Sequence, residues 1–211
     1  YGGQSCHGRA CVEEFIDYFV VNLCIQNWDG FFNNYYAYHD TEGTGRWEIY
    51  PWDEDKTWGD YDGASARYDW YELPLTYGMA GDPQPASTSL LAWLGFGGGL
   101  HGGPSWWRRG GWFSAPLLAN PEFRKRCLAR LAEFCTTEFT EEKFGLVIDA
   151  MEKRLEPEVA WRAQVAGEAA AAADGRFRSD IQSFRKQVKY RRKFLLAELA
   201  KAPVPAASPT P

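Results

Sequence analysis

The sequence lacks several signatures by which common protein classes are recognised. Its three histidines are scattered and its five cysteines include no C-x-x-C pair, so a zinc site is not expected. No apolar run is long enough to span a membrane, and no signal peptide is visible. The net charge of -5 argues against a nucleic-acid-binding protein, which would need a basic face.

Cysteine usage leaves the redox compartment open. Cys127 and Cys135 fall in an apolar helical pattern, which predicts buried thiols. Cys6 and Cys11 lie close together near the start of the chain and could form a local disulfide if the protein is exported, so their disulfide state stays open.

Aromatic residues, in contrast, are abundant, at 16% of the chain with ten tryptophans. Several of these tryptophans lie among glycines between Trp93 and Trp112, inside a stretch from about 63 to 114 that has no clear periodicity. Such a stretch is either a functional loop system or contains short helices, one of them at 90–96. The glycines from Gly97 to Gly103 have no strand before them and do not indicate a phosphate-binding loop.

Helical periodicity dominates the two ends of the chain. Residues 10–27 predict an amphipathic helix, because their apolar side chains recur at spacings of three and four. Three more helices are predicted: one behind the N-cap Asn120, one from Thr140 that is interrupted or kinked at Pro157 and ends near Gly175, and one capped by Ser179. Their expected buried stripes are Phe123, Cys127, Leu128, Leu131 and Phe134; Phe144, Val147, Ile148 and Met151; and Ile181, Phe184, Val188, Leu195, Leu196 and Leu199. The last helix also carries a basic run that predicts a solvated face: Arg185, Lys186, Lys189, Arg191, Arg192 and Lys193.

Acidic and amide side chains flank a predicted β-hairpin with strands at 34–39 and 46–52. Asp29 and Asn34 are five residues apart on the turn before the hairpin, and Asp53 follows the second strand. Protein kinases place a catalytic Asp, an Asn five residues later and a metal-binding Asp after a hairpin in this same order. Phosphoryl transfer needs a carboxylate that orients the attacking hydroxyl and a hard divalent cation, which prefers oxygen ligands.

These residues stand in strings that resemble the CotH kinase family, the atypical protein kinases related to spore coat protein H. The strings are Asn27-Trp28-Asp29, Asn34-Tyr35-Tyr36 and Tyr50-Pro51-Trp52-Asp53-Glu54-Asp55, closed by Trp58-Gly59. The likeness continues through Asn120-Pro121-x-Phe123-Arg124 and the basic final helix, and so covers about 12–199. Trp58 replaces the usual Phe, and Glu54 with Lys56 makes the loop more charged than usual, but no catalytic group is lost.

The resemblance implies a function and a site. It implies transfer of the γ-phosphoryl group of ATP to Ser or Thr of a protein acceptor with Mg²⁺ or Mn²⁺. Asp29 matches the catalytic Asp, Asn34 and Asp53 match the residues that hold the metal and its nucleotide, and Asp55 supports the metal or the loop. The source implied is bacterial, and the location is secreted, at the cell surface or associated with a coat.

The resemblance also implies a fold. We expect the α+β class, namely the mainly helical C-lobe of an atypical kinase with a small β-hairpin that carries the metal site. Only 28 residues precede Asp29, and they include no Gly-rich loop followed by a nucleotide-pairing Lys. We therefore expect 1–200 to be a C-terminal lobe without its N-lobe, inactive by itself, and 201–211 to be a disordered Pro, Ala and Ser-rich tail.

Other functions remain open at the level of sequence. A non-catalytic binding or coat-assembly module could use the same lobe. Asp29 and Asp53 could be the carboxylate pair of a carbohydrate site lined by tryptophans, although such a site has no set use for Asn34. The residue types at Thr57 and Trp58 exclude an EF-hand loop beginning at Asp53, but not another oxygen-rich calcium site. In the kinase interpretation, the region from Trp93 to Trp112 is a candidate acceptor groove.

Overall fold

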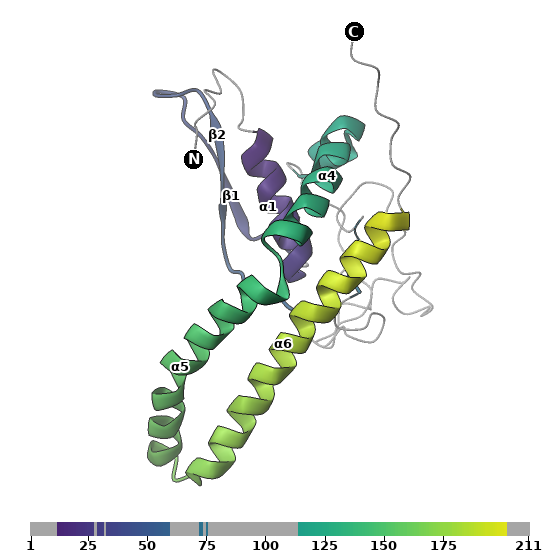
Figure 1. Ribbon diagram of the computed structural model, residues 1–211. Coiled ribbons are helices and arrows are strands. Elements are labelled where there is room, and N and C mark those ends of the chain that lie inside the picture. The colour runs from purple at the N-terminus through teal and green to yellow at the C-terminus, as the bar shows by residue number, and fades with distance from the viewer. Residues whose placement is uncertain are drawn as a thin grey trace, which may run out of the picture.

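A computed structural model of the chain describes residues 12–27, 29–31, 33–59, 72–73, 75 and 114–201. Its elements, in chain order, are α1 (Val12–Ile25), β1 (Tyr35–His39), β2 (Trp47–Pro51), α3 (Ser114–Ala119), α4 (Pro121–Thr137), α5 (Glu141–Val165) and α6 (Ala170–Lys201) (Figure 1). A helical majority with one small antiparallel sheet agrees with the predicted α+β class.

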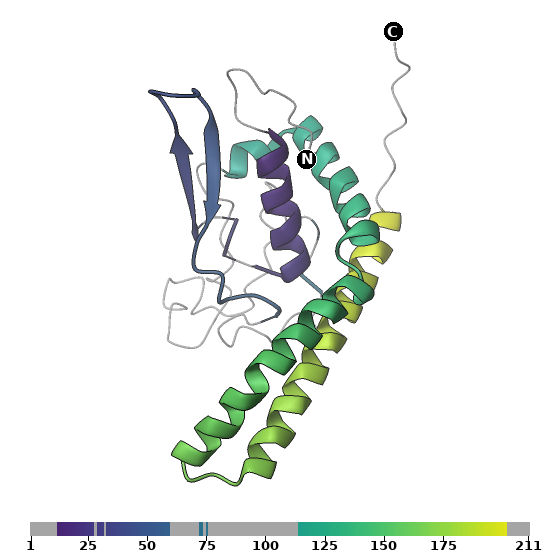
Figure 2. The same ribbon diagram turned by 60° about the vertical axis from the view of Figure 1, so that its left-hand side comes forward.

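Helix α1 forms the centre of the core. It lies between the β-hairpin and α4 in Figure 2, and it also contacts the middle of α6. Its predicted apolar stripe is buried, with Phe19 and Val20 fully inaccessible to solvent. Burial of each such side chain stabilises the fold by about 1.5–3 kcal/mol. Helix α1 is therefore held in place by the core, and it positions the turn that follows it.

The end of α1 comes before the predicted boundary at residue 27. Gln26 adopts a left-handed conformation with a φ of 58°, and the Asn27 amide donates back to the Asn22 carbonyl at 3.0 Å. This six-residue closure is the hydrogen bond of a Schellman motif, in which a left-handed residue stops the helix. The chain thereby turns sharply just before Asp29.

Strands β1 and β2 pair antiparallel in the predicted hairpin, with Tyr35 opposite Pro51 and His39 opposite Trp47. At the far end of the hairpin, the Asp40 carboxylate accepts hydrogen bonds from the Gly43 amide at 3.0 Å and the Thr44 amide at 2.6 Å. Because the strands are antiparallel, the opposite end of the hairpin brings Asn34, which precedes β1, close to Trp52 and Asp53, which follow β2.

Helix α4 begins as predicted. The Asn120 side chain accepts hydrogen bonds from the amides of Glu122 and Phe123, and Pro121 takes the first helical position. Its inward face buries Phe123, Cys127, Leu131 and Cys135, which confirms that Cys127 and Cys135 are core thiols. Burial raises the pKa of Cys127 to about 12, so this thiol stays protonated at neutral pH.

Helices α5 and α6 form a long antiparallel hairpin that projects from the body (Figure 1), and its boundaries differ from those predicted. Helix α5 continues through Pro157 and ends at Val165. Gly167 terminates it with a φ of 68°, its amide donating to Gln164 and that of Glu168 to Ala163. The alanines that we expected to end the second helix instead open α6, because alanine has the highest helix propensity. Ser179 therefore lies inside α6 and caps nothing.

Two predictions about exposure were wrong. Val147 and Met151 were expected in the buried stripe of α5, but their side chains are 52% and 54% exposed. Arg191 was expected on a solvated face, but it is fully buried and donates to the carbonyls of Leu23 and Leu73. The Leu23 carbonyl belongs to the last turn of α1, where carbonyls lack intrahelical partners and the helix dipole favours a cation.

Several predictions concern residues outside the described ranges. These are the pair Cys6 and Cys11, the possible helix at 90–96, the tryptophans from Trp93 to Trp112, and the tail after Lys201. No helix in the described part of the chain combines the length and apolar character needed to cross a membrane.

Candidate active site

Asp29 lies on a tight turn directly after α1. The Asn33 amide donates to the Asp29 carbonyl at 2.9 Å, and the Tyr18 hydroxyl donates to the Gly30 carbonyl at 2.8 Å. A Cβ atom on Gly30 would stand 2.6 Å from Nδ2 of Asn27, so only glycine allows this close approach. These hydrogen bonds and the close packing at Gly30 hold the turn in place, and Asp29 is only 8% exposed.

Asn34 joins the Asp29 turn to the loop after β2. Its Nδ2 donates to Oδ2 of Asp29 at 2.6 Å and lies 3.4 Å from the Asp53 carbonyl oxygen. The Asn34 carbonyl in turn accepts from the Trp52 amide at 3.0 Å. The structure therefore brings Asp29, Asn34 and Asp53 together, at the end of the hairpin where the sequence placed them.

The orientation of Asn34 leaves its oxygen available. Because Nδ2 faces Asp29, Oδ1 is directed elsewhere and accepts one hydrogen bond, from the side-chain Nδ2 of Asn33 at 2.8 Å, in an exposed contact. The Asp53 side chain is exposed as well, with a φ of 55° that turns the backbone sharply after β2. Asn34 and Asp53 thus bring one amide oxygen and one carboxylate to the same end of the hairpin, where Nδ2 of Asn34 lies 3.4 Å from the main-chain oxygen of Asp53.

Asp55 is not part of this group. Its side chain is exposed, and no hydrogen bond or ion pair joins it to Asp29, Asn34 or Asp53 in the described part of the chain. Of the four site residues predicted from the sequence, Asp55 is the one that the structure leaves apart.

Asn22, Asn27 and Glu54 form a polar cluster that adjoins the Asp29 turn. Asn27 donates through Nδ2 to Oε2 of Glu54 at 2.5 Å and to Oδ1 of Asn22 at 3.2 Å. Its own Oδ1 accepts from the Gly30 amide at 3.1 Å. A single amide side chain therefore connects α1, the Asp29 turn and the loop after β2.

Glu54 is the least expected member of this cluster. Burial raises the pKa of the Glu54 carboxyl, and the nearby Asp29 charge raises it further, while the hydrogen bond from Asn27 opposes both. Within the described ranges, Oε1 of Glu54 is buried without a hydrogen-bond partner. Sequence reasoning recorded Glu54 only as an added charge and gave Asn27 no role. The sole signal for Asn27 was its place in the string Asn27-Trp28-Asp29.

The loop after β2 is anchored by Trp58. Its amide donates to the Ile25 carbonyl at 2.6 Å, and its ring packs edge-on against Phe184 of α6 at 4.7 Å between centroids. The same ring also contacts Phe139 and Phe144. The replacement of Phe by Trp noted in the sequence therefore fills the junction between α1, α5 and α6.

A family model described as CotH kinase protein matches residues 12–195, which is most of the chain. The chain belongs to the CotH kinase family. No curated protein and no solved structure gives a significant match. Membership confirms the resemblance found in the strings around Asp29 and Asp53, and it suggests kinase-like chemistry with ATP and a divalent cation.

The residues of this chain fit such a cation only in part. Among the described residues, no group of three His, Cys, Asp or Glu side chains is placed to hold a metal ion. Asn34 and Asp53 would supply two oxygens, and phosphates and water would supply the others. Mg²⁺ is commonly bound in this way, through one or two carboxylates and the substrate phosphates.

Proposed function

We propose that this CotH kinase transfers the γ-phosphoryl group of ATP to a Ser or Thr hydroxyl of a protein acceptor. The observation that carries the proposal is the position of Asn34, which donates to Asp29 on one side and adjoins Asp53 on the other. This joins a candidate base to a candidate metal ligand, as phosphoryl transfer requires.

In the proposed reaction, Asp29 accepts a hydrogen bond from the acceptor hydroxyl and takes its proton. The hydroxyl oxygen bonds to the γ-phosphorus as the bond from that phosphorus to the bridging oxygen of ADP breaks. Asn34 holds the Asp29 carboxylate in position through its amide. Oδ1 of Asn34 and the Asp53 carboxylate would hold a Mg²⁺ or Mn²⁺ ion, which neutralises charge on the phosphates when bound.

Asn34 favours phosphoryl transfer over the carbohydrate alternative. A glycosidase needs two carboxylates that face a sugar from opposite sides. Here the amide of Asn34 donates to the Asp29 carboxylate and adjoins Asp53. The acceptor groove at Trp93 to Trp112, a bacterial source and a secreted, surface or coat-associated location remain proposals that rest on the sequence alone.

The test is transfer of labelled phosphate from ATP with Mg²⁺ or Mn²⁺, measured on the complete gene product that carries this sequence. Asp29→Asn should lower transfer at least about a hundredfold, because a positioned acid-base group contributes that much or more. Asp53→Ala should also lower transfer, because it removes a proposed ligand of the ion that stabilises charge on the phosphates. Asp40→Asn makes the same chemical change at the far end of the hairpin and should leave transfer intact. If both site variants label like the wild type, the kinase function is refuted, and a non-catalytic binding or coat-assembly module becomes the better account.

A further inference from the structure

Helix α5 carries an apolar stripe that α6 does not cover. Four side chains on it are more than half exposed: Val147 at 52%, Met151 at 54%, Trp161 at 57% and Val165 at 68%. The face that packs on α6 is a different one, because it buries Ile148 and Ala163. Large apolar side chains aligned on an exposed helix face are typical of an interaction surface.

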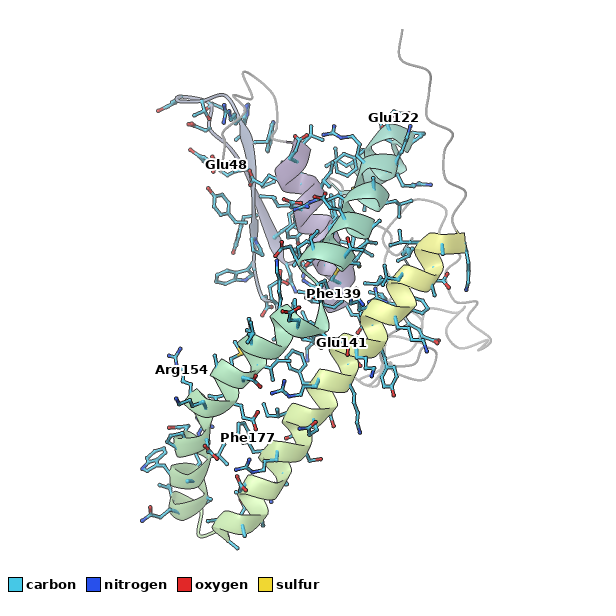
Figure 3. All side chains as sticks on the ribbon, in the orientation of Figure 1. Glu48, Glu122, Phe139, Glu141, Arg154 and Phe177 are labelled. Carbon is cyan, nitrogen blue, oxygen red and sulfur yellow. The ribbon has the colours of Figure 1, made fainter. Side chains whose placement is uncertain are left out.

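Two charged residues complete this line, which we call the α5 stripe. From Val147 the stripe continues through Met151, Arg154, Glu158, Trp161 and Val165, at alternating steps of four and three residues. That spacing is the seam of a coiled coil, in which one helix meets another along its length. In Figure 3, Arg154 lies on the side of α5 that faces away from α6.

The stripe has a symmetry that identifies its partner. Reversed about Glu156, it matches itself in kind: Val147 takes the place of Val165, Met151 takes that of Trp161, and Arg154 takes that of Glu158. Two copies laid antiparallel would therefore put apolar residues opposite apolar residues at both ends. At the centre, Arg154 of each copy would face Glu158 of the other. A surface that is complementary to itself in this way is what a two-fold dimer requires.

We propose that α5 binds α5 of a second copy of this chain, antiparallel and about a two-fold axis near Glu156. The charges support this partner. In the described part of the chain, Arg154 is exposed and has no ion pair of its own. Glu158 pairs only with exposed Arg162 on the same helix, at 2.8 Å, which is a weak surface contact that Arg154 of the second copy can join or replace.

The test exploits the central charge pairs in the full 211-residue chain. Sedimentation equilibrium of the wild type should show a monomer–dimer equilibrium. Arg154→Glu places two carboxylates opposite each other twice, and Glu158→Arg does the same with two cations. Each variant should associate at least about tenfold more weakly than the wild type, because like charges in an interface cost several kcal/mol.

Mixing identifies the partner and the register together. The two single variants, each weakly associating alone, should form a heterodimer when mixed, because every central pair is then of opposite charge. The double variant Arg154→Glu/Glu158→Arg should recover self-association. Lys153→Glu makes the same charge change about 100° around the helix axis from Arg154, outside the α5 stripe, and should have no effect. Circular dichroism should show an intact fold in all variants.

Three outcomes would overturn the proposal. The first is a wild type that stays monomeric throughout the concentration series, which would leave the α5 stripe to a different partner. The second is a mixture of the single variants that associates no better than either alone, which would exclude the antiparallel register. The third is a loss of association in Lys153→Glu equal to that in Arg154→Glu, which would assign the effect to net charge.

Discussion

Asn27 offers the sharpest test of how the site is built, because its amide is the donor at the centre of the buried cluster. Asn27→Asp keeps the shape of the side chain but replaces the NH₂ group by a carboxylate oxygen. The hydrogen bonds from Nδ2 to Glu54, at 2.5 Å, and to Asn22, at 3.2 Å, are then lost. The bond that the Gly30 amide donates to Oδ1 is retained.

The cost follows from the two acceptors left behind. A buried acceptor that loses its donor costs about 1–3 kcal/mol, so the two together predict a loss of about 2–6 kcal/mol in the free energy of unfolding. Repulsion between the new carboxylate and Glu54 moves the value toward the upper end. Since a domain of this size is stabilised by only about 5–15 kcal/mol, urea unfolding would register the change clearly.

A double-mutant cycle isolates the contact with Glu54. In Asn27→Asp/Glu54→Gln, the amide introduced at position 54 can donate to the carboxylate introduced at position 27, so the bond re-forms in the reverse direction. The double variant should be more stable than Asn27→Asp alone by at least about 1 kcal/mol. Strictly additive effects of the two substitutions would refute the direct contact, and a near-neutral Asn27→Asp would refute the role of the cluster.

Two further predictions concern the turn at the far end of the hairpin and the contact between α6 and α1. The amides of Thr44 and Gly43 donate to the charged form of Asp40 and hold the pKa of that carboxyl below its ordinary value. The hairpin turn should therefore keep these bonds above about pH 3.9 and lose them only as the pH falls through the lower folded-state pKa. The Thr44 amide shift in NMR should follow this titration, and a midpoint at or above that ordinary value would contradict it. Arg191→Met leaves the buried carbonyls of Leu23 and Leu73 without their charged donor and should lower the free energy of unfolding by about 2–4 kcal/mol; a neutral effect in urea unfolding would show that Arg191 does not hold α6 to α1.

Local sequence patterns predicted the frame around the site well. The apolar period of α1, the alternation of the two strands and the cap at Asn120 are local signals, and each is present in the structure. The order of Asp29, Asn34 and Asp53 around the predicted strands also predicted correctly that the three residues lie close together. An antiparallel hairpin necessarily brings the residues before its first strand and after its second strand to the same end.

Features that depend on distant contacts were not predictable in this way. The burial of Arg191 requires the end of α1 to lie against the middle of α6, and nothing in the basic run around it distinguishes that position from its neighbours. The exposure of Val147 and Met151 depends on which flank of α5 faces α6. The role of Glu54 depends on Asn27, which lies 27 residues away in the sequence.

Asn34 and Asp53 each meet two requirements, one of backbone conformation and one of side-chain chemistry. Asn34 and Asp53 both have a φ of 55°, in the left-handed region that Asn and Asp tolerate better than most other residues with a side chain. Glycine would satisfy the backbone at either position, but it would bring no oxygen to a metal and no amide to Asp29. Alanine would bring neither the conformation nor the chemistry. The two sharp turns at the open end of the hairpin and the two groups proposed to hold the cation are therefore provided by the same two residues, and for this reason a short hairpin is sufficient to build the site.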